Sequence, residues 1–544
     1  MRSCAAAPIV MSRKRNFSEC LGDSGRVRRD ELVRLIVQCV RELGYEESSR
    51  ALEAESGVLL HSAEVGAFRD NVLQGNWEAI RETLPPLGDP SGVTVRFLIY
   101  EQRYLEALYA GDFPGALDTL RQRLGPLGCR PERVQELSSW AMTCGSPEGV
   151  RTKAGWAPGR DCILNARHAL LHALQAHVAP GVLVPEGRLV ELMEQAVEGQ
   201  VQRCAFHNTK QVCFSLFEDH VCTRQQIPTR TVAVLGGHSD EVWHVQFSHD
   251  GTRLASASKD NSVVVWDVSG LMTHSSGEAE GKAGDFASRK ASSPPPVRLH
   301  TLVGHTNHLS FVAWSPDDTM LLSCSNDMTV RLWRISDGMC LQTLSRHVDS
   351  VTSCAWFPDN RRFVSGGLDK CVYQWDIDGK CEEIQSGSRI NDLVISSDGS
   401  FMVSVCSDKK IHILTFDNQV SETIAEEDSI TSIFLSKDGR YLLLNLSQEC
   451  IHIWDLRAKK LVHRYQGQRQ GRYVIRSCLG GTNQSFVASG SEDSRVYIWH
   501  RSSEELLNSI SGHSGTVNAV CWNPVDPHMF ASASDDHTVR LWGL

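Results

Sequence analysis

Histidine, serine and aspartate recur at fixed spacing in the second half of this 544-residue chain. In one set, His305 is followed by Ser323, Asp327 and Trp333. A histidine that takes a proton from a serine while an aspartate orients it could activate that serine as a nucleophile. The arrangement occurs four times, however, and one enzyme does not need four identical active sites. We therefore expect a structural role and no catalytic residue in the four sets, which are His238, Ser256, Asp260 and Trp266; His305, Ser323, Asp327 and Trp333; His347, Ser365, Asp369 and Trp375; and His513, Ser532, Asp536 and Trp542.

The spacing of these sets predicts the elements that position them. The interval from His to Asp is 22 residues in three sets and 23 in the last, and the interval from Asp to Trp is 6 in all four. Repetition near every 40 residues with this signature is typical of β-propeller blades of four strands each. We expect the His on the loop that leads into each blade and the Asp on the turn between its second and third strands. The carboxylate, Ser hydroxyl and Trp N–H would then form one buried hydrogen-bond network.

The same offset of six residues identifies three more blades that lack the leading histidine. These offsets join Asp408 to Leu414, Gln448 to Trp454, and Asp493 to Trp499. The ring therefore has seven predicted blades, of which the fourth and fifth are degenerate. Residues 229–235 alternate polar and apolar side chains, so we expect them to form the outer strand of the last blade and to close the ring.

Binding partners are expected on the face that carries the histidine loops and the aspartate turns. The residue just before each turn position differs from blade to blade, whereas the network residues repeat. Variable residues on a fixed scaffold are where recognition can be built. The predicted partner-binding positions are Lys259, Asn326, Leu368, Ser407, Ser447, Glu492 and Asp535.

One interval between blades is much longer than the others. Trp266 and Trp333 are 67 residues apart, against 39 to 45 for the other intervals. The excess, residues 270–298, is of low complexity and predicts a disordered insertion. It should join the third strand of one blade to the outer strand of the next, on the face opposite the aspartate turns. A docking segment and a simple linker are both compatible with its composition.

The N-terminal part of the chain is predicted to be helical after a disordered stretch, residues 1–28. Apolar residues then recur at helical spacing, and Gly44 is placed to end the helix. A second short helix follows, and two helices of about 30 residues cannot bury a sufficient core alone. They must pack on a second copy of the chain or on the following helices, and we favour the second copy. The predicted dimerisation residues are Leu32, Leu35, Ile36, Val40, Leu43 and Tyr45.

Residues 62–125 continue as predicted helical hairpins. Gly75-Asn76 separates two helices, and a Gly-Asp turn at 111–112 separates two more. The aromatic residues of the second pair, Phe97, Tyr100, Tyr104 and Phe113, are expected in its core. Residues 126–228 form a further, less regular helical segment, with a loop at 144–160 and helices at 163–176 and 185–201.

Composition excludes several classes of protein. The net charge of −10 argues against generic nucleic-acid binding, and no apolar run is long enough for a transmembrane helix. Cys204, Cys213 and Cys222 lie nine residues apart with His207 nearby. That spacing matches no usual zinc pattern, so we expect reduced cysteines, no metal site and no cofactor.

The order of these segments resembles a known family. Residues 29–61 resemble the LisH dimerisation motif, residues 62–125 resemble the CTLH module, the segment 126–228 is CRA-like, and seven WD repeats follow. This order is similar to the WD-repeat subunit of the GID/CTLH ubiquitin ligases. The match is best at residues 97–124 and at the junction containing His207-Asn208-Thr209-Lys210.

The resemblance implies a non-catalytic scaffold. Such subunits self-associate, join RING-bearing LisH/CTLH subunits, and present substrates or adaptors on the propeller, in the cytoplasm and nucleus. The chain itself has no Cys/His pattern of RING spacing. A LisH–CTLH–WD scaffold of a splicing or transcriptional-repression complex is the alternative. An enzyme is disfavoured, because the chain contains no Walker A loop, GxSxG or HExxH motif.

Overall fold

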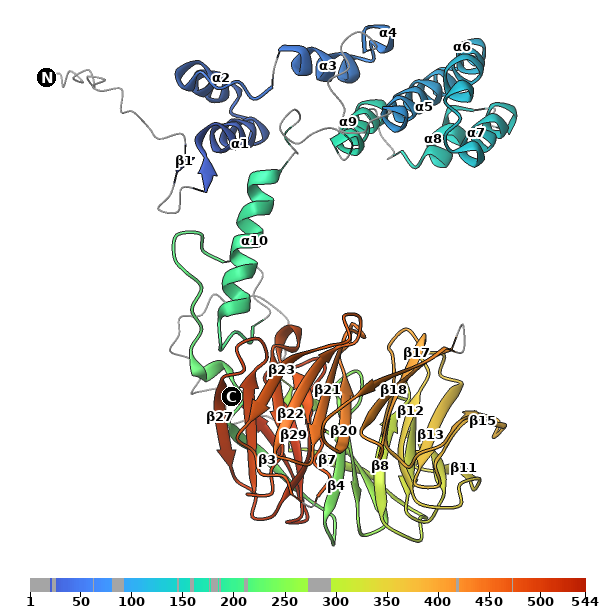
Figure 1. Ribbon diagram of the computed structural model, residues 1–544, viewed down its shortest axis with the longest axis vertical. Coiled ribbons are helices and arrows are strands. Elements are labelled where there is room, and N and C mark those ends of the chain that lie inside the picture. The colour runs from blue at the N-terminus through green and yellow to red at the C-terminus, as the bar shows by residue number, and fades with distance from the viewer. Residues whose placement is uncertain are drawn as a thin grey trace, which may run out of the picture. The chain divides into compact units, whose positions relative to one another are not determined.

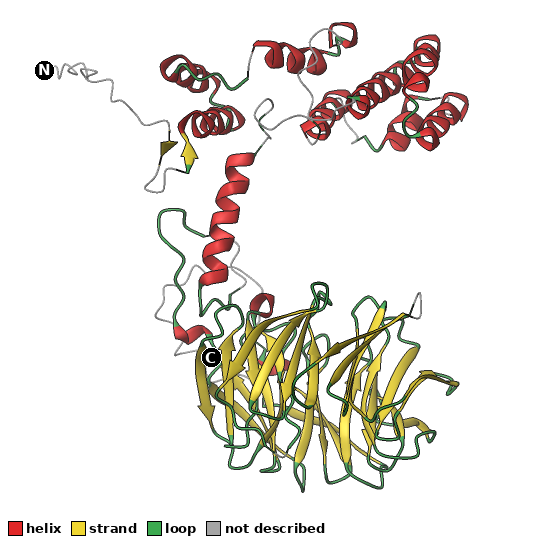
Figure 2. Cartoon of the chain, viewed as in Figure 1, coloured by secondary structure: helices red, strands yellow, loops and turns green. Residues whose placement is uncertain are grey.

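The computed structural model describes residues 20–21, 26–61, 63–80, 92–143, 146–156, 161–175, 177, 184, 187–209, 214–272, 295–416, 420–471 and 473–544. The chain divides into two compact units, Met1–Ala196 and Val197–Leu544. Helices make up the first unit, and strands dominate the second (Figure 2). No helix within the described ranges combines the length and the apolar character needed to span a bilayer.

The helices of the chain follow the predicted order with several short additions. They are α1 (Arg29–Glu42), α2 (Glu46–Ser56), α3 (Ala63–Gln74), α4 (Trp77–Ile80), α5 (Val93–Tyr109), α6 (Phe113–Asp118), the π-helix η1 (Thr119–Leu124), the 3-10 turn η2 (Gly125–Leu127), α7 (Pro131–Thr143), α8 (Pro147–Ala154), α9 (Cys162–Gln175) and α10 (Arg188–Arg203). A two-residue pairing of β1 (Cys20–Leu21) with β2 (Val27–Arg28) precedes them. The prediction that residues 1–28 are disordered is therefore wrong for these four residues.

Helices α1 and α2 form a hairpin whose ends are set by local sequence. Asp30 and Glu31 lie in the first turn of α1, where carboxylates complement the helix dipole. Gly44 follows α1 with φ +89°, a conformation that glycine adopts without strain. The small core of the hairpin contains the fully buried Val37 and Leu60. The face of α1 that points inward is thus centred on Val37, one residue away from the predicted stripe.

Helices α3 to α9 contain two further apolar cores. One surrounds Phe68 and Val72 of α3, and the other surrounds Phe97 and Tyr104 of α5. Phe97 and Tyr104 are fully buried, as expected, but Phe113 is 40% exposed because it begins α6 at the hairpin turn. The expectation that Phe113 is a core residue is therefore wrong.

The segment 126–228 differs from its prediction in two places. Residues 147–154 form α8, although a loop was expected there, because Ser146 caps the helix by accepting the Gly149 N–H at 3.3 Å. Within 204–209 and 214–228, the described residues of the next stretch, only the 3-10 turn η3 (Arg224–Gln226) is helical, and the stretch belongs to the second unit. The boundary between the two units lies within α10, which has no buried residue.

Seven sheets of four antiparallel strands form the propeller (Figure 1). The first three blades are β4 (Val242–Phe247), β5 (Arg253–Ser258), β6 (Ser262–Asp267) and β7 (Val297–Val303); β8 (Leu309–Trp314), β9 (Met320–Ser325), β10 (Val330–Arg334) and β11 (Cys340–Leu344); and β12 (Val351–Trp356), β13 (Arg362–Gly367), β14 (Cys371–Asp376) and β15 (Cys381–Ser386). The number of blades agrees with the prediction, including the two degenerate ones.

The remaining four blades complete the ring. They are β16 (Ile390–Ile395), β17 (Phe401–Cys406), β18 (Lys410–Thr415) and β19 (Val420–Ala425); β20 (Ile430–Leu435), β21 (Tyr441–Leu446), β22 (Cys450–Asp455) and β23 (Lys460–Gln466); β24 (Cys478–Gly480), with the 3-10 turn η5 (Thr482–Gln484), β25 (Phe486–Ser489), β26 (Arg495–His500) and β27 (Leu506–Ser511); and β28 (Val517–Trp522), β29 (Phe530–Ser534), β30 (Thr538–Gly543) and β3 (Arg230–Gly236).

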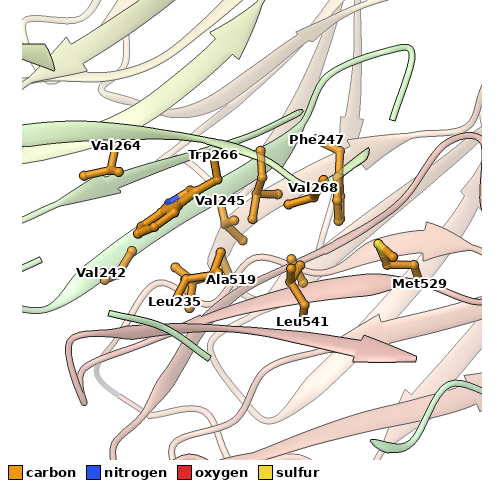
Figure 3. Close-up of a cluster of buried hydrophobic side chains, with 14 residues drawn as sticks. Leu235, Val242, Val245, Phe247, Val264, Trp266, Val268, Ala519, Met529 and Leu541 are labelled. Atoms are coloured by element: carbon orange, nitrogen blue, oxygen red, sulfur yellow. The ribbon is translucent and has the colours of Figure 1, made fainter. Parts of the chain in front are cut away.

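The ring closes by pairing the start of the unit with its end. Strand β3 runs antiparallel to β30, with Thr231 opposite Trp542 and Leu235 opposite Val539. An apolar cluster then joins this last blade to the first, as Leu235 and Leu541 lie near Val245 (Figure 3). The ring closure predicted from the alternation of residues 229–235 is therefore present. Because β3 pairs with β30, that edge of β30 is not left exposed.

The long interval between the first two WD signatures lies within one blade. It connects β6 to β7, and these two strands pair with each other, with Ser262 opposite Val303. The prediction that it leads to the next blade is thus wrong. Residues 269–271 form the 3-10 turn η4 (Ser269–Leu271), and residues 297–298 begin β7. The disorder predicted for residues 270–298 is therefore wrong at both ends, and residues 273–294 lie outside the described residues.

Candidate protein-interaction site

Four blades contain a chain of hydrogen bonds that links the histidine loop to the aspartate turn. In blade 3, the Asp369 carboxylate lies 2.8 Å from His347 Nδ1, and His347 Nε2 lies 2.8 Å from Ser365 Oγ. Trp375 Nε1 donates to the same serine oxygen at 2.8 Å. The equivalent His–Asp distances are 3.0, 2.8 and 2.8 Å at His238–Asp260, His305–Asp327 and His513–Asp536.

The ionisation of these groups fixes the direction of the hydrogen bonds. Burial lowers the pKa of His305 and His347, and this outweighs the opposing effect of the neighbouring aspartates. Burial alone would raise the pKa of Asp327, but hydrogen bonds from Thr329, the Thr306 backbone N–H and His305 lower it to about 2. A neutral imidazole therefore donates its Nδ1–H to an ionised carboxylate, and its Nε2 accepts from the serine hydroxyl.

This network is unsuited to catalysis. The serines Ser256, Ser323, Ser365 and Ser532 are all 0% exposed, so no substrate can reach their hydroxyl groups. Each aspartate also accepts the backbone N–H of the residue after the histidine, for example Ser239 N–H at 3.0 Å from Asp260. The network thus joins the loop and the turn rigidly, which fixes the face of the propeller that both elements form.

The three remaining blades have other hydrogen bonds between the third strand and a neighbouring loop or turn. In blade 5, the Glu426 carboxylate accepts from Trp454 Nε1 at 2.7 Å and lies 3.0 Å from His452 Nδ1. In blade 6, Tyr497 Oη donates to Asp493 at 2.7 Å, and in blade 4 His412 Nε2 lies 3.2 Å from Asp408. Sequence reasoning missed His452, Tyr497 and His412 because they lie outside the four repeated positions. It missed Glu426, which takes the histidine position 28 residues before Trp454, because the residue type differs. The sequence did contain a signal for Glu426, because it is an acidic residue just before the first strand of a blade that lacks the leading histidine.

All seven predicted partner-binding residues occupy equivalent positions. The backbone N–H of each donates to a carbonyl of the loop that leads into the same blade, at 2.9 to 3.0 Å. These bonds are Lys259 to Glu241, Asn326 to His308, Leu368 to Ser350, Ser407 to Arg389, Ser447 to Ser429, Glu492 to Arg469 and Asp535 to Thr516. Ser407 is exposed and the other six residues are half-buried. The residues across these bonds, such as Glu241 and Arg389, lie on the same face and were not singled out from the sequence.

Two of the charged positions are held by their neighbours. Lys259 Nζ donates to Glu241 at 2.9 Å and lies 3.7 Å from Asp240. Asp535 accepts from Asn518 Nδ2 at 2.6 Å. Burial, with the nearby Glu241, raises the pKa of Asp535. The junction of blades 7 and 1 therefore presents clustered acidic groups around one lysine.

Glu492 in blade 6 has a structural task of its own. Its carboxylate accepts the backbone N–H groups of Gly471 and Tyr473, at 2.8 and 3.1 Å. It therefore orders the loop before β24 as well as facing the surface. Lys259, Glu492 and Asp535 are thus involved in contacts within the propeller. The positions in blades 2 to 4 are better sites for testing recognition, because a substitution there disturbs fewer such contacts.

Three of the six predicted dimerisation residues are exposed on the first unit, whereas Leu35 packs against the core that contains Val37 and Leu60. Ile36, Leu43 and Tyr45 are 36%, 68% and 63% exposed, and Leu32, Leu35 and Val40 are half-buried. Ile36 lies in α1, and Leu43 and Tyr45 lie between α1 and α2. Exposed large apolar side chains that are close together are typical of an interaction surface. Self-association through these residues remains a prediction.

Comparisons with known proteins agree with this architecture. Residues 18–62 match the WDR26 Lis-homology domain. The chain is 39% identical over 533 residues to a WD repeat-containing protein 26 homolog of Arabidopsis thaliana, which covers 97% of this chain and 86% of the relative. The chain belongs to the WD repeat-containing protein 26 family.

Two further relatives in this family come from distant organisms. A WD repeat-containing protein 26 homolog of Drosophila melanogaster is 35% identical, over 97% of this chain and 83% of its own length. GID complex subunit 7 of Schizosaccharomyces pombe is 34% identical, over 94% of this chain and 96% of its own length. The WD domain, G-beta repeat family matches residues 229–267, 296–334, 338–376, 379–414, 459–500 and 504–543. It misses blade 5, in which Glu426 replaces the usual network.

Proposed function

We propose that this chain is a non-catalytic scaffold subunit of a multi-subunit RING-type E3 ubiquitin ligase. It oligomerises through its LisH and CTLH helices and presents substrates or adaptors on the propeller face. It acts in the cytoplasm and nucleus, and the RING chemistry belongs to other subunits.

The observation that carries this proposal is the relative named GID complex subunit 7, which aligns along 96% of its length. The similarity extends over both the helical part and the propeller, which favours the same role for each part in this chain as in that relative. The buried serines support the absence of catalysis, because the groups that resemble a triad are closed to substrates. The seven equivalent, variable positions support a recognition surface on a rigid frame.

The first experiment is a pull-down of the tagged full chain from cells, followed by identification of the co-eluting proteins. RING-bearing proteins with LisH and CTLH segments should be enriched, and ubiquitin-ligase activity should accompany the eluate. Enrichment of spliceosomal proteins or corepressors without RING subunits would contradict the proposal and favour the alternative scaffold.

A second experiment separates the two binding surfaces. Leu368→Arg combined with Ser407→Arg should remove partners that bind the propeller face, because two long cations would block adjacent blades. The LisH/CTLH partners should remain. Val420→Arg is the matched control, since Val420 is 49% exposed on the outer strand of blade 4, away from the aspartate turns. Equal partner sets for both variants would show that this face does not recognise them.

A further inference from the structure

Four metal-ligand side chains converge in the irregular segment that follows α10. Cys204 Sγ, His220 Nε2 and Cys222 Sγ all lie within 4.8 Å of one another. His207 joins them, because its Nδ1 atom lies 2.9 Å from His220 Nε2 and 3.7 Å from Cys222 Sγ. Cys222 Sγ and His220 Nε2 are 3.1 Å apart. The expectation that this region holds no metal site rested on spacing alone, whereas the fold brings these side chains together.

The distances among His207, His220 and Cys222, 2.9 to 3.7 Å, are close to those around a tetrahedral ion. Zinc bonds of about 2.0–2.3 Å to nitrogen and sulfur place neighbouring ligand atoms roughly 3.3–3.8 Å apart. A small outward shift of the two imidazoles would satisfy that geometry. Both cysteines are free thiols rather than a disulfide. Two thiolates and two neutral imidazoles would balance the charge of Zn²⁺ and match its preferred ligands.

The surroundings resemble the shell of a structural metal. His207 and Cys222 are 5% and 9% exposed. The Phe214 ring lies 5.0 Å from the His220 ring and 6.0 Å from the His207 ring, so it shields the ligands from water. The Gln226 side chain hydrogen-bonds to Cys222. Hydrogen bonds and apolar shielding of this kind orient metal ligands and exclude solvent.

The ligand-bearing part of the segment has no regular secondary structure to order it. Among its described residues, 204–209 and 214–223, none belongs to a helix or strand. The His220 backbone N–H donates to Gln200 Oε1 at 3.0 Å, which ties the ligand loop to the last turns of α10. Short segments without a core of their own commonly depend on a metal or a disulfide for order.

We propose that Cys204, His207, His220 and Cys222 bind one zinc ion as a closed structural site. With four protein ligands, the site has no open position for catalysis. The ion anchors residues 204–228 to blades 6 and 7. Asn208 directly follows the ligand His207 in the sequence and is fully buried. Its Nδ2 donates to the Pro527 carbonyl at 2.8 Å, and its Oδ1 accepts the Thr482 N–H at 3.0 Å.

The test begins with the metal content of the full chain, purified without chelators and measured by elemental mass spectrometry. About one zinc per chain is expected, and Cys204→Ser with Cys222→Ser should lose it. Cys340→Ser is the matched control, because Cys340 is a half-buried free cysteine outside the cluster. Zinc retained in the double variant, or no zinc in the wild type after incubation with Zn²⁺, would overturn the proposal.

A second measurement starts with the wild-type chain, so it does not require the double cysteine variant to fold. Co²⁺ added to the metal-free wild type should give the intense visible bands of a tetrahedral site and a thiolate charge-transfer band in the near ultraviolet. His220→Cys should retain metal, since three thiolates and one imidazole also hold zinc, whereas His220→Ala should weaken binding at least tenfold. A Cys204–Cys222 disulfide in the native protein, or no spectral change with Co²⁺, would refute the site.

Discussion

A single serine hydroxyl in each of four blades is the hydrogen-bond partner of both the histidine Nε2 and the tryptophan N–H. In blade 3, Ser365 Oγ accepts from Trp375 and donates to His347, which in turn donates to Asp369. A buried donor or acceptor left without a partner costs about 1–3 kcal/mol. The serine is therefore important for stability although its side chain is small.

Ser365→Ala should lower the free energy of unfolding of the propeller by about 1–3 kcal/mol, because the imidazole and the indole both lose their partner. Urea unfolding followed by tryptophan fluorescence measures the difference. Ser407→Ala is the control, since Ser407 is exposed, and its effect should stay within about 0.5 kcal/mol. Equal stability of the two variants would show that the network contributes nothing.

The same residues predict a dependence of stability on pH. Burial keeps the pKa of His305 and His347 below 6.5, so below that pH the unfolded chain takes up protons that the folded chain resists. Stability should therefore decrease as the pH falls below about 6.5. The contribution of Asp327 is fully present above its ordinary pKa of 3.8 and disappears as the pH falls towards about 2.

Thermal unfolding should accordingly occur at a lower temperature at pH 5 than at pH 7.5. In His347→Gln the difference between the two pH values should shrink, because one of the buried imidazoles is gone. A melting temperature that rises on acidification would contradict the assignment of neutral histidines.

At the scale of elements, α1 contributes exposed apolar residues to the surface, and β3 closes the propeller ring. Helix α1 packs Val37 against Leu60 and leaves Ile36 exposed, and Leu43, which directly follows the helix, is exposed as well. Strand β3 comes from the start of the second unit but completes its last blade. Helix α1 is therefore a candidate interface, and β3 holds the two ends of the propeller together.

Ile36→Asp with Leu43→Asp should abolish self-association, raising the dimer dissociation constant at least about 100-fold, because a buried, unpaired charge is costly. Light scattering of the purified chain measures the mass. Leu59→Asp is the matched control, since Leu59 is 61% exposed after α2 and outside the stripe. An unchanged mass in the double variant would show that the stripe is not the interface.

Leu235→Ala should destabilise the propeller by about 2–5 kcal/mol, since Leu235 is 5% exposed in the cluster that joins blades 7 and 1. Val234→Ala, one residue away, changes a side chain that is 50% exposed. Its effect should be within about 0.5 kcal/mol. If both variants unfold at the same urea concentration, ring closure does not depend on this strand.

At the scale of the molecule, the ring and the segment before it form one folding unit. That unit begins at Val197, well before the first strand. Ile227 is 3% exposed in a cluster with Phe486 and Trp522, and Asn208 bonds to blades 6 and 7. The propeller therefore includes residues that belong to no blade.

A fragment of residues 197–544 should fold, whereas residues 229–544 should be less stable by at least about 2–5 kcal/mol, because they lack the buried Ile227. Urea unfolding of the two fragments, monitored by circular dichroism, measures this difference. Identical transitions would show that residues 197–228 are a passive linker.

The repeat determined much of the fold from the sequence alone, because each His, Ser, Asp and Trp lies within one blade, at sequence separations of 4 to 29 residues. Local strand pairing turns such spacing directly into geometry. The blade count, the ring closure and the exposed apolar residues of the α1–α2 hairpin follow from patterns of the same kind.

Only the tertiary structure decided which groups meet when no repeat relates them. Glu426 takes the histidine position of blade 5, 28 residues before Trp454, but the spacing alone does not show that a carboxylate there would bind both Trp454 and His452. Cys204 and Cys222 approach His207 and His220 because an irregular segment folds back on itself and is held by blades 6 and 7. Such contacts depend on how loops pack against the completed ring, and local spacing carries no record of that packing.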